Sequence, residues 1–280
     1  MQKIKIKNNQ GIKLKGYYHK SSSPNVILYI PGLAGAYDEL AQAVGLMCEN
    51  ENIGFCFAYN QGSGEIKELV QIENGVENTV IKGSCFENFE SIVPDIDCFV
   101  EFLKNEEYEN IYFVGHSMGN DKSIYYLNNT KRENVKALVL LAPQDMRSIT
   151  QSEYHKSLYQ EAQDFNKLNN GTQILSKPFM GFCKMSANTL CQYNEFEGLF
   201  SLPYRQEHGD WQYYNNVKVP KIIIMGEFDQ GLDLTNGKTV YTNMSKFDKD
   251  EIVVINDAKH TFKHHESEVA ENIKNFIRRF

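Results

Sequence analysis

Apolar residues in this sequence gather in short continuous runs, and the segments between the runs space their apolar residues differently. A continuous apolar run is typical of a strand covered on both faces, because a strand with one face in water alternates apolar and polar residues. Such runs predict strands along most of the chain, and two alternating segments predict an opening pair. The runs lie within residues 26–30, 53–59, 111–115, 137–143, 221–229 and 251–257, and the alternating segments lie at 3–7 and 12–18.

Between the strands, apolar residues recur at intervals of three and four positions, which is the spacing of one helix face. Residues 40–47, 92–103 and 269–280 show this pattern. Pro94 falls in the first turn of the second helix, where proline is tolerated. Strands and helices therefore alternate, which predicts an α/β fold with a mostly parallel sheet of about eight strands between helices.

The alternation is interrupted after Pro143 and resumes at residue 221. A simple crossover between parallel strands needs only about a dozen residues, so we interpret residues 144–218 as an insertion. The predicted organisation is a core domain of residues 1–143 and 219–280, with the insertion as a cap.

Composition narrows the class of protein. The chain has 280 residues, of which 23% are charged, and a net charge of −7, with no basic stretch suited to a phosphate backbone, so no nucleic-acid partner is expected. No apolar run approaches the roughly 20 residues of a bilayer span, and the first residues lack a signal-like apolar core, so we expect a cytoplasmic protein without stable membrane association. Six cysteines without a CxxC pair indicate buried thiols rather than a metal site.

The most informative short segment is GHSMG, residues 115–119, at the end of one predicted strand and the start of a helix. Glycines on both sides allow a sharp turn that lifts the serine side chain above the carboxyl edge of the sheet. The first amides of the helix favour negative charge developing there. We therefore predict Ser117 as a nucleophile rather than a simple turn residue.

A serine hydroxyl needs a base, and the base needs an orienting carboxylate. Asp229 and His260 follow the last two predicted strands, which gives the chain order Ser, Asp, His. Asp233 and Glu227 are the alternative acids. Other histidines near these motifs are interpreted as packed or exposed residues: His116 within the turn, and His264 and His265 on the terminal helix.

A second glycine-bearing turn, YIPGLAG at residues 29–35, follows another strand. Glycine lets the backbone approach a substrate closely, so its amides are candidates for an oxyanion hole. We predict that the amides of Leu33 and Met118 form this hole, and that Gly32 contacts the substrate. A plain strand-to-helix turn is the alternative.

At these residues the chain resembles the α/β-hydrolase family, over nearly its whole length outside the insertion. PGLAG looks like the HGxxG turn of that family with Pro31 in place of histidine, and GHSMG is similar to its nucleophile elbow. GEFDQG and AKHTF are similar to its acid turn and base loop. YNQGSGE looks like a degraded DxRGxGxS loop, with Tyr59 and Gln61 at the Asp and Arg positions.

Within that family the layout looks most like small-molecule esterases of the cinnamoyl or feruloyl esterase and acylglycerol lipase type, in which an insertion at this place resembles a helical cap over the serine. The insertion is rich in aromatic residues, among them Phe182 and Trp211, which we predict to contact the substrate. The alternative is that these aromatic residues build the core of the cap itself.

The sequence therefore predicts a serine hydrolase, with a small ester carrying an apolar or aromatic acyl group as its substrate. This chemistry requires no metal and no organic cofactor. A thioesterase, a peptidase and a carbon–carbon bond hydrolase could use the same three residues, and a non-catalytic binding protein on this fold is the alternative outside enzymes.

Overall fold

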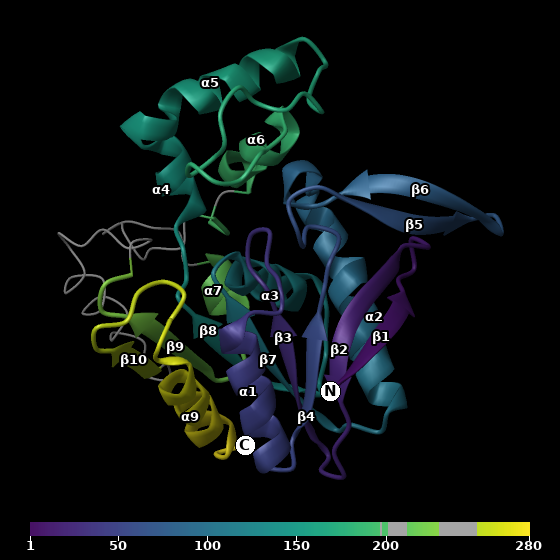
Figure 1. Cartoon of the computed structure of the whole chain (residues 1–280), viewed down its shortest axis with the longest axis vertical. Helices are drawn as coiled ribbons and strands as arrows, with labels where there is room; N and C mark the ends of the chain where they lie inside the picture. Colours follow the sequence, from purple (N-terminus) through teal and green to yellow (C-terminus); the bar gives the residue numbers. More distant parts are fainter. Residues whose placement is uncertain (197, 201–211, 230–250) are drawn as a thin grey trace.

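Eight strands form the central sheet in the computed structural model, which describes residues 1–196, 198–200, 212–229 and 251–280 (Figure 1). Their order across the sheet is β1-β2-β4-β3-β7-β8-β9-β10. The strands are β1 (Gln2–Lys7), β2 (Lys13–His19), β3 (Asn25–Ile30), β4 (Gly54–Ala58), β7 (Asn110–His116), β8 (Val135–Leu141), β9 (Lys221–Gly226) and β10 (Glu251–Ile255). The six strands from β4 to β10 in this order are parallel, and β1 and β2 are antiparallel additions at one edge. The mostly parallel sheet predicted from the apolar runs is confirmed.

Helices cover both faces of the sheet: α1 (Glu39–Asn50), α2 (Ile92–Asn105), α3 (Met118–Asn129) and α9 (Glu266–Ile277). Alternate residues of one buried strand enter different cores. Val26 and Leu28 pack in the core that contains the apolar residues of α2 and α3, whereas Ile27 and Tyr29 pack in the core of α1 and α9. This two-sided burial explains why the strand is continuously apolar.

A hairpin that the sequence analysis did not identify lies between β4 and α2. Its strands, β5 (Lys67–Glu73) and β6 (Val76–Lys82), pair with each other and project beside the main sheet (Figure 1). Leu69 is the one buried residue of its two strands, so the hairpin lacks the continuous apolar runs of the main sheet. Its turn does have a signal, because Asn74 and Gly75 both adopt positive φ, as a two-residue hairpin loop requires.

The segment predicted as an insertion carries α4 (Met146–Gln151), α5 (Glu153–Lys167), α6 (Ala187–Glu195) and α7 (Gln212–Asn216). Figure 1 shows α4, α5 and α6 as a separate layer beyond the carboxyl ends of the parallel strands. The helix α7 instead lies against α3, where Asn128 Nδ2 donates a hydrogen bond to the carbonyl of Tyr213 at 2.8 Å. None of the described helices has the length and apolar character that crossing a membrane requires.

Two short 3₁₀ turns, Ser84–Phe86 and Phe89–Ser91, lead into α2. At the other end of the chain, the expectation that His264 and His265 lie on the terminal helix is wrong. The helix α9 begins at Glu266, with His265 as its N-cap residue, and His264 adopts a positive φ of 72° that no helix interior allows.

Candidate active site

Ser117 occupies a strained turn between β7 and α3. Its φ of 54° and ψ of −125° lie outside the ordinary helix and strand regions. The flanking glycines are required on steric grounds. A Cβ atom on Gly115 would lie 2.6 Å from the carbonyl oxygen of Gly119, and one on Gly119 would lie 2.1 Å from the carbonyl oxygen of Ile30. The motif therefore holds Ser117 in a backbone conformation that the surrounding structure imposes.

The structure brings together the three residues predicted for a catalytic triad. His260 Nε2 lies 3.0 Å from Ser117 Oγ, and His260 Nδ1 lies 3.0 Å from Asp229 Oδ1. The Asp229 side chain is completely buried, whereas 30% of the His260 side chain is exposed. This is the geometry of a nucleophile, a base and an orienting carboxylate.

The alternative acids do not take this place in the described structure. Glu227 Oε2 accepts a hydrogen bond from the amide of Asp257 at 3.0 Å, so its carboxylate caps a turn. Asp233 lies outside the described residues.

His116 is buried beside the site, with its ring stacked on that of His260 at a centroid distance of 5.3 Å. Its Nε2 atom lies 3.0 Å from the carbonyl oxygen of His260. Burial, and then the positive charge of His260, lower the pKa of His116 to about 4. His116 is therefore a packed residue, as expected from the sequence, and its neutral ring also supports the loop carrying His260.

The turn after β3 approaches Ser117 closely. A Cβ atom on Gly32 would lie 2.8 Å from Ser117 Cβ and 3.3 Å from the Met118 amide nitrogen, so only glycine fits there. Met118 is the first residue of α3, and its amide has no acceptor within the helix. Among the described residues, neither the Met118 amide nor the Leu33 amide donates a hydrogen bond. The role of these two amides as an oxyanion hole stays a prediction, with which this geometry is compatible.

A cavity of about 750 Å³ opens over Ser117 and His260. Its floor includes Gly32 and Leu33, and its outer wall comes from the insertion, through Tyr154, Met180 and Phe182. Phe182 is 61% exposed although it lines this cavity, which leaves its ring available to a ligand. Trp211, the other predicted aromatic contact, lies outside the described residues.

Other aromatic residues of the insertion build its own core. Phe179, Tyr193 and Phe200 are buried, and Tyr193 packs edge to face on Phe200 at 5.0 Å between ring centroids. These three residues therefore build the core of the cap, which was the alternative to substrate contact. Phe182 and Tyr154 instead line the cavity.

His155 of α5 is a cavity residue that the sequence analysis missed. Its Nε2 accepts a hydrogen bond from the Met180 amide at 3.0 Å, and its Nδ1 lies 3.0 Å from Ser152 Oγ. Burial lowers the pKa of His155, which keeps the ring neutral, as an accepting Nε2 requires. His155 thereby fixes the turn that carries Met180 and Phe182.

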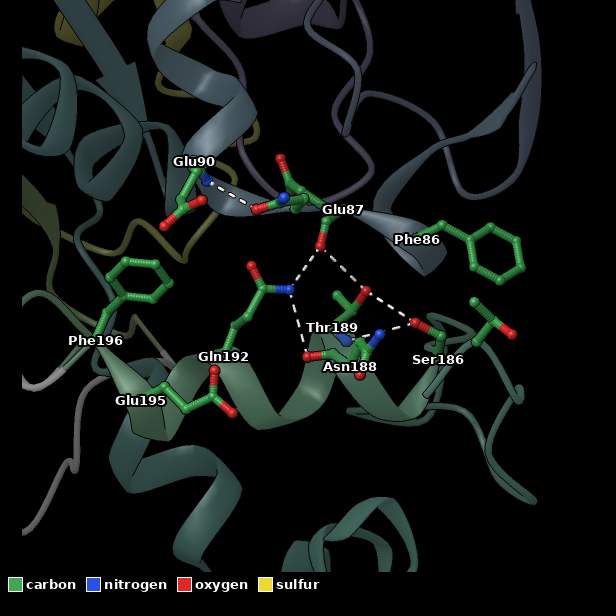
Figure 2. Close-up of a pocket in the computed structure, with 11 residues that line it drawn as sticks. Phe86, Glu87, Glu90, Ser186, Asn188, Thr189, Gln192, Glu195 and Phe196 are labelled. Carbon is green, nitrogen blue, oxygen red and sulfur yellow. Dashed lines mark hydrogen bonds between the residues drawn. The ribbon is translucent and has the colours of Figure 1, made fainter. Parts of the chain in front are cut away.

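A second cavity, of about 350 Å³, lies between α6 and the residues leading into α2 (Figure 2). Its polar groups pair largely with each other. Gln192 Nε2 donates to the carbonyl of Glu87 at 2.8 Å, Gln192 Oε1 accepts from the Phe89 amide at 2.8 Å, and Thr189 Oγ1 donates to the carbonyl of Cys85 at 3.0 Å. These hydrogen bonds form a polar seam that holds α6 of the insertion against the core.

The loop that resembles a degraded DxRGxGxS motif is held by a buried carboxylate. Asp95 accepts hydrogen bonds from the Gln61 amide at 2.6 Å, from Gln61 Nε2 at 3.0 Å and from Asn8 Nδ2 at 2.7 Å. Burial raises the pKa of Asp95 to about 6 even though these hydrogen bonds oppose the shift. Nearby, the buried Lys122 Nζ lies 2.7 Å from Glu87 Oε1. These groups connect the loop to α2 and α3 and do not reach the cavity over Ser117.

Within the described ranges, no three His, Cys, Asp or Glu side chains gather in a way that could hold a metal ion.

Comparison with known proteins agrees with this fold. Residues 87–279 match the model of a family described as protein of unknown function, DUF1749. No curated protein matches the chain in sequence.

Several solved structures are similar over nearly the whole chain. Est1E from Butyrivibrio proteoclasticus, solved with ferulic acid, is 18% identical with a TM-score of 0.67, over 99% of this chain and 98% of that one. The Pyrococcus furiosus esterase Pf2001 is 16% identical with a TM-score of 0.59, over 100% and 90% of the two chains. The alpha/beta hydrolase domain-containing protein 10 from mouse is 14% identical with a TM-score of 0.63, over 100% and 99%. The predicted α/β-hydrolase fold is therefore confirmed.

Proposed function

Because this chain belongs to the DUF1749 family and has the α/β-hydrolase fold, with a serine, a histidine and an aspartate hydrogen-bonded in series, we propose that it is a serine hydrolase acting on carboxylic esters. The observation that carries the proposal is the pair of contacts made by His260, one to Ser117 Oγ at 3.0 Å and one to Asp229 Oδ1 at 3.0 Å. A binding protein without catalysis gains nothing from this arrangement.

In the proposed reaction, His260 Nε2 removes the proton of Ser117 as Oγ attacks the carbonyl carbon of the ester. Negative charge develops on the carbonyl oxygen, where the amides of Leu33 and Met118 donate to it. Asp229 accepts the hydrogen bond from Nδ1 and stabilises the positive imidazolium. His260 then gives its proton to the leaving alcohol, and water, activated by the same base, releases the acid from Ser117.

The walls of the cavity favour an ester with an apolar or aromatic acyl group. Met146, Ile149, Met180 and Phe182 supply apolar surface, and a volume of about 750 Å³ suits a small molecule. Asp38 is the acidic residue among the described lining residues, and no lysine or arginine is among them. A strongly anionic acyl group would therefore lack a charge partner.

Steady-state hydrolysis of p-nitrophenyl acetate, butyrate and benzoate tests the proposal. We expect turnover by the wild-type protein and a loss of about 10³-fold or more in kcat for Ser117→Ala, since the nucleophile is removed. Ser157→Ala, an exposed serine of α5, is the matched control and should retain full activity. Equal turnover by Ser117→Ala and wild type would refute the proposed nucleophile, and faster cleavage of a matched thioester would assign the enzyme to the thioesterases.

A further inference from the structure

Gln144 lies where β8 passes into the insertion, two residues after Ala142 and directly after Pro143. Gln144 is buried, with a relative exposure of 2%, and it lines the cavity over Ser117. One end of its amide, Nε2 in the structure, lies 3.1 Å from His260 Nδ1. The same ring atom lies 3.0 Å and 3.2 Å from the two carboxylate oxygens of Asp229. Two side chains therefore compete for one ring nitrogen.

The hydrogen on His260 Nδ1 determines which end of the Gln144 side-chain amide faces the ring. The ring nitrogen Nδ1 either carries one hydrogen and donates it, or carries none and accepts. For His260 to act as a base toward Ser117, Nε2 must be bare, so Nδ1 carries the hydrogen and donates it to Asp229. An amide NH₂ facing this N–H has no lone pair to meet, whereas an amide oxygen does. The nitrogen and oxygen of a glutamine are assigned from their hydrogen-bond partners, and an Nδ1–H of His260 favours the oxygen at this position.

We propose that Gln144 is a positioning residue for His260, whose side-chain carbonyl accepts a second hydrogen bond from Nδ1–H beside that of Asp229. The inference rests on the proposed function. Gln144 fixes the ring at Nδ1 and presents a carbonyl dipole to the imidazolium that forms during attack. Both effects lower the barrier for proton transfer from Ser117 without touching the substrate.

The groups around His260 determine how the influence of Gln144 on its ring can be measured. Asp229 and the ring of His116 face it directly, and Asp38 and His155 line the same cavity. Because the pKa of His116 is lowered to about 4, His116 stays neutral between pH 5 and 8. His116 therefore contributes no titration of its own in that range.

The test combines two substitutions with a control. Gln144→Met keeps the length of the side chain and removes the acceptor, so the pKa of His260 should fall by about half a unit and kcat by about 10-fold, with KM within about 2-fold. Gln144→Glu adds a charged acceptor and should raise the pKa of His260 by about one unit. Gln2→Met, an exposed residue of β1, should change neither quantity.

The readouts are the acidic limb of the kcat/KM profile and an NMR titration of the His260 ring, assigned with His260→Ala. In the wild-type ring at neutral pH, ¹⁵N shifts should show the tautomer with hydrogen on Nδ1. The opposite tautomer, a pKa of His260 that rises in Gln144→Met, or unchanged titrations in both variants would each overturn the inference, and so would a change confined to KM. A wild-type protein without hydrolytic activity would instead overturn the proposed function, while the ring titration would still report on Gln144.

Discussion

At the scale of single residues, a steric contact of Gly119, two positions after Ser117, ties the candidate nucleophile to the turn after β3. Gly119 lies in the first turn of α3, and an added Cβ there would meet the backbone of Ile30 and Pro31, which lead to Gly32 and Leu33. The position of the nucleophile and that of the oxyanion amides thus depend on one close backbone approach. A displacement of the backbone at Gly119 would therefore move the nucleophile and the oxyanion amides together.

We therefore expect Gly119→Ala to lower the free energy of unfolding by about 3 kcal/mol, in the range of severe overpacking, and to reduce ester hydrolysis strongly. Gly45→Ala in α1 is the control, because the nearest atom to its added Cβ is the flexible end of Met1, at 2.8 Å. Urea unfolding of both variants measures the difference. Equal free energies of unfolding for the two variants would mean that the backbone around Ile30 shifts at little cost.

Sequence reasoning was effective at this scale where a residue type and its turn form a motif. GHSMG, PGLAG and the strand ends before Asp229 and His260 pointed to residues that the fold does bring together. Gln144 could not be found in this way. An amide side chain has no motif, and its relevance comes from a contact with His260 across 116 positions of the chain.

At the scale of elements, the position of α6 depends on the polar seam in Figure 2. Gln192 satisfies the amide of Phe89 and the carbonyl of Glu87 with a single side chain. A leucine at this position has a similar size and no polar atom, so it leaves the Phe89 amide without its acceptor.

Gln192→Leu is expected to lower the free energy of unfolding by about 1–3 kcal/mol, the cost of a buried unsatisfied backbone group. Gln160→Leu on the exposed side of α5, where the side chain donates a hydrogen bond to Asp164, should stay within about 0.5 kcal/mol of wild type. Chemical denaturation at one pH compares the two. A Gln192→Leu protein as stable as the control would show that the seam contributes little.

The elements predicted from apolar patterns were those with buried faces. The parallel strands are continuously apolar and the helices α1, α2 and α9 are periodically apolar, because each has at least one face in a core. The β5–β6 hairpin was missed since its strands are mostly polar, and only the Asn74-Gly75 pair marked its turn. Exposed hairpins of this kind have little effect on hydrophobic periodicity.

At the scale of the whole molecule, buried polar groups couple folding to pH. The pKa of Asp95 is raised by burial to about 6 from an ordinary value of 3.8. Between these values the folded protein keeps a proton that the unfolded chain releases. The free energy of unfolding therefore falls as the pH rises through this window, and the contribution is fully present only below pH 4.

Asp95→Asn removes this titration, so the stability of the wild type relative to the variant should fall by about 2 kcal/mol between pH 4 and pH 7. Urea unfolding of both proteins at four pH values measures the trend, whatever the absolute cost of the substitution. Parallel pH dependences for the two proteins would show that Asp95 has an ordinary pKa in the fold.

The central claim is that Ser117 is a nucleophile activated by His260. Incubation with a fluorophosphonate, followed by intact mass and peptide mapping, tests it directly. We expect one added phosphonyl group per chain, located on Ser117. Ser117→Ala should gain no mass, and His260→Ala should be labelled at a strongly reduced rate. A folded wild-type protein that stays unlabelled, or a label on another residue, would contradict it.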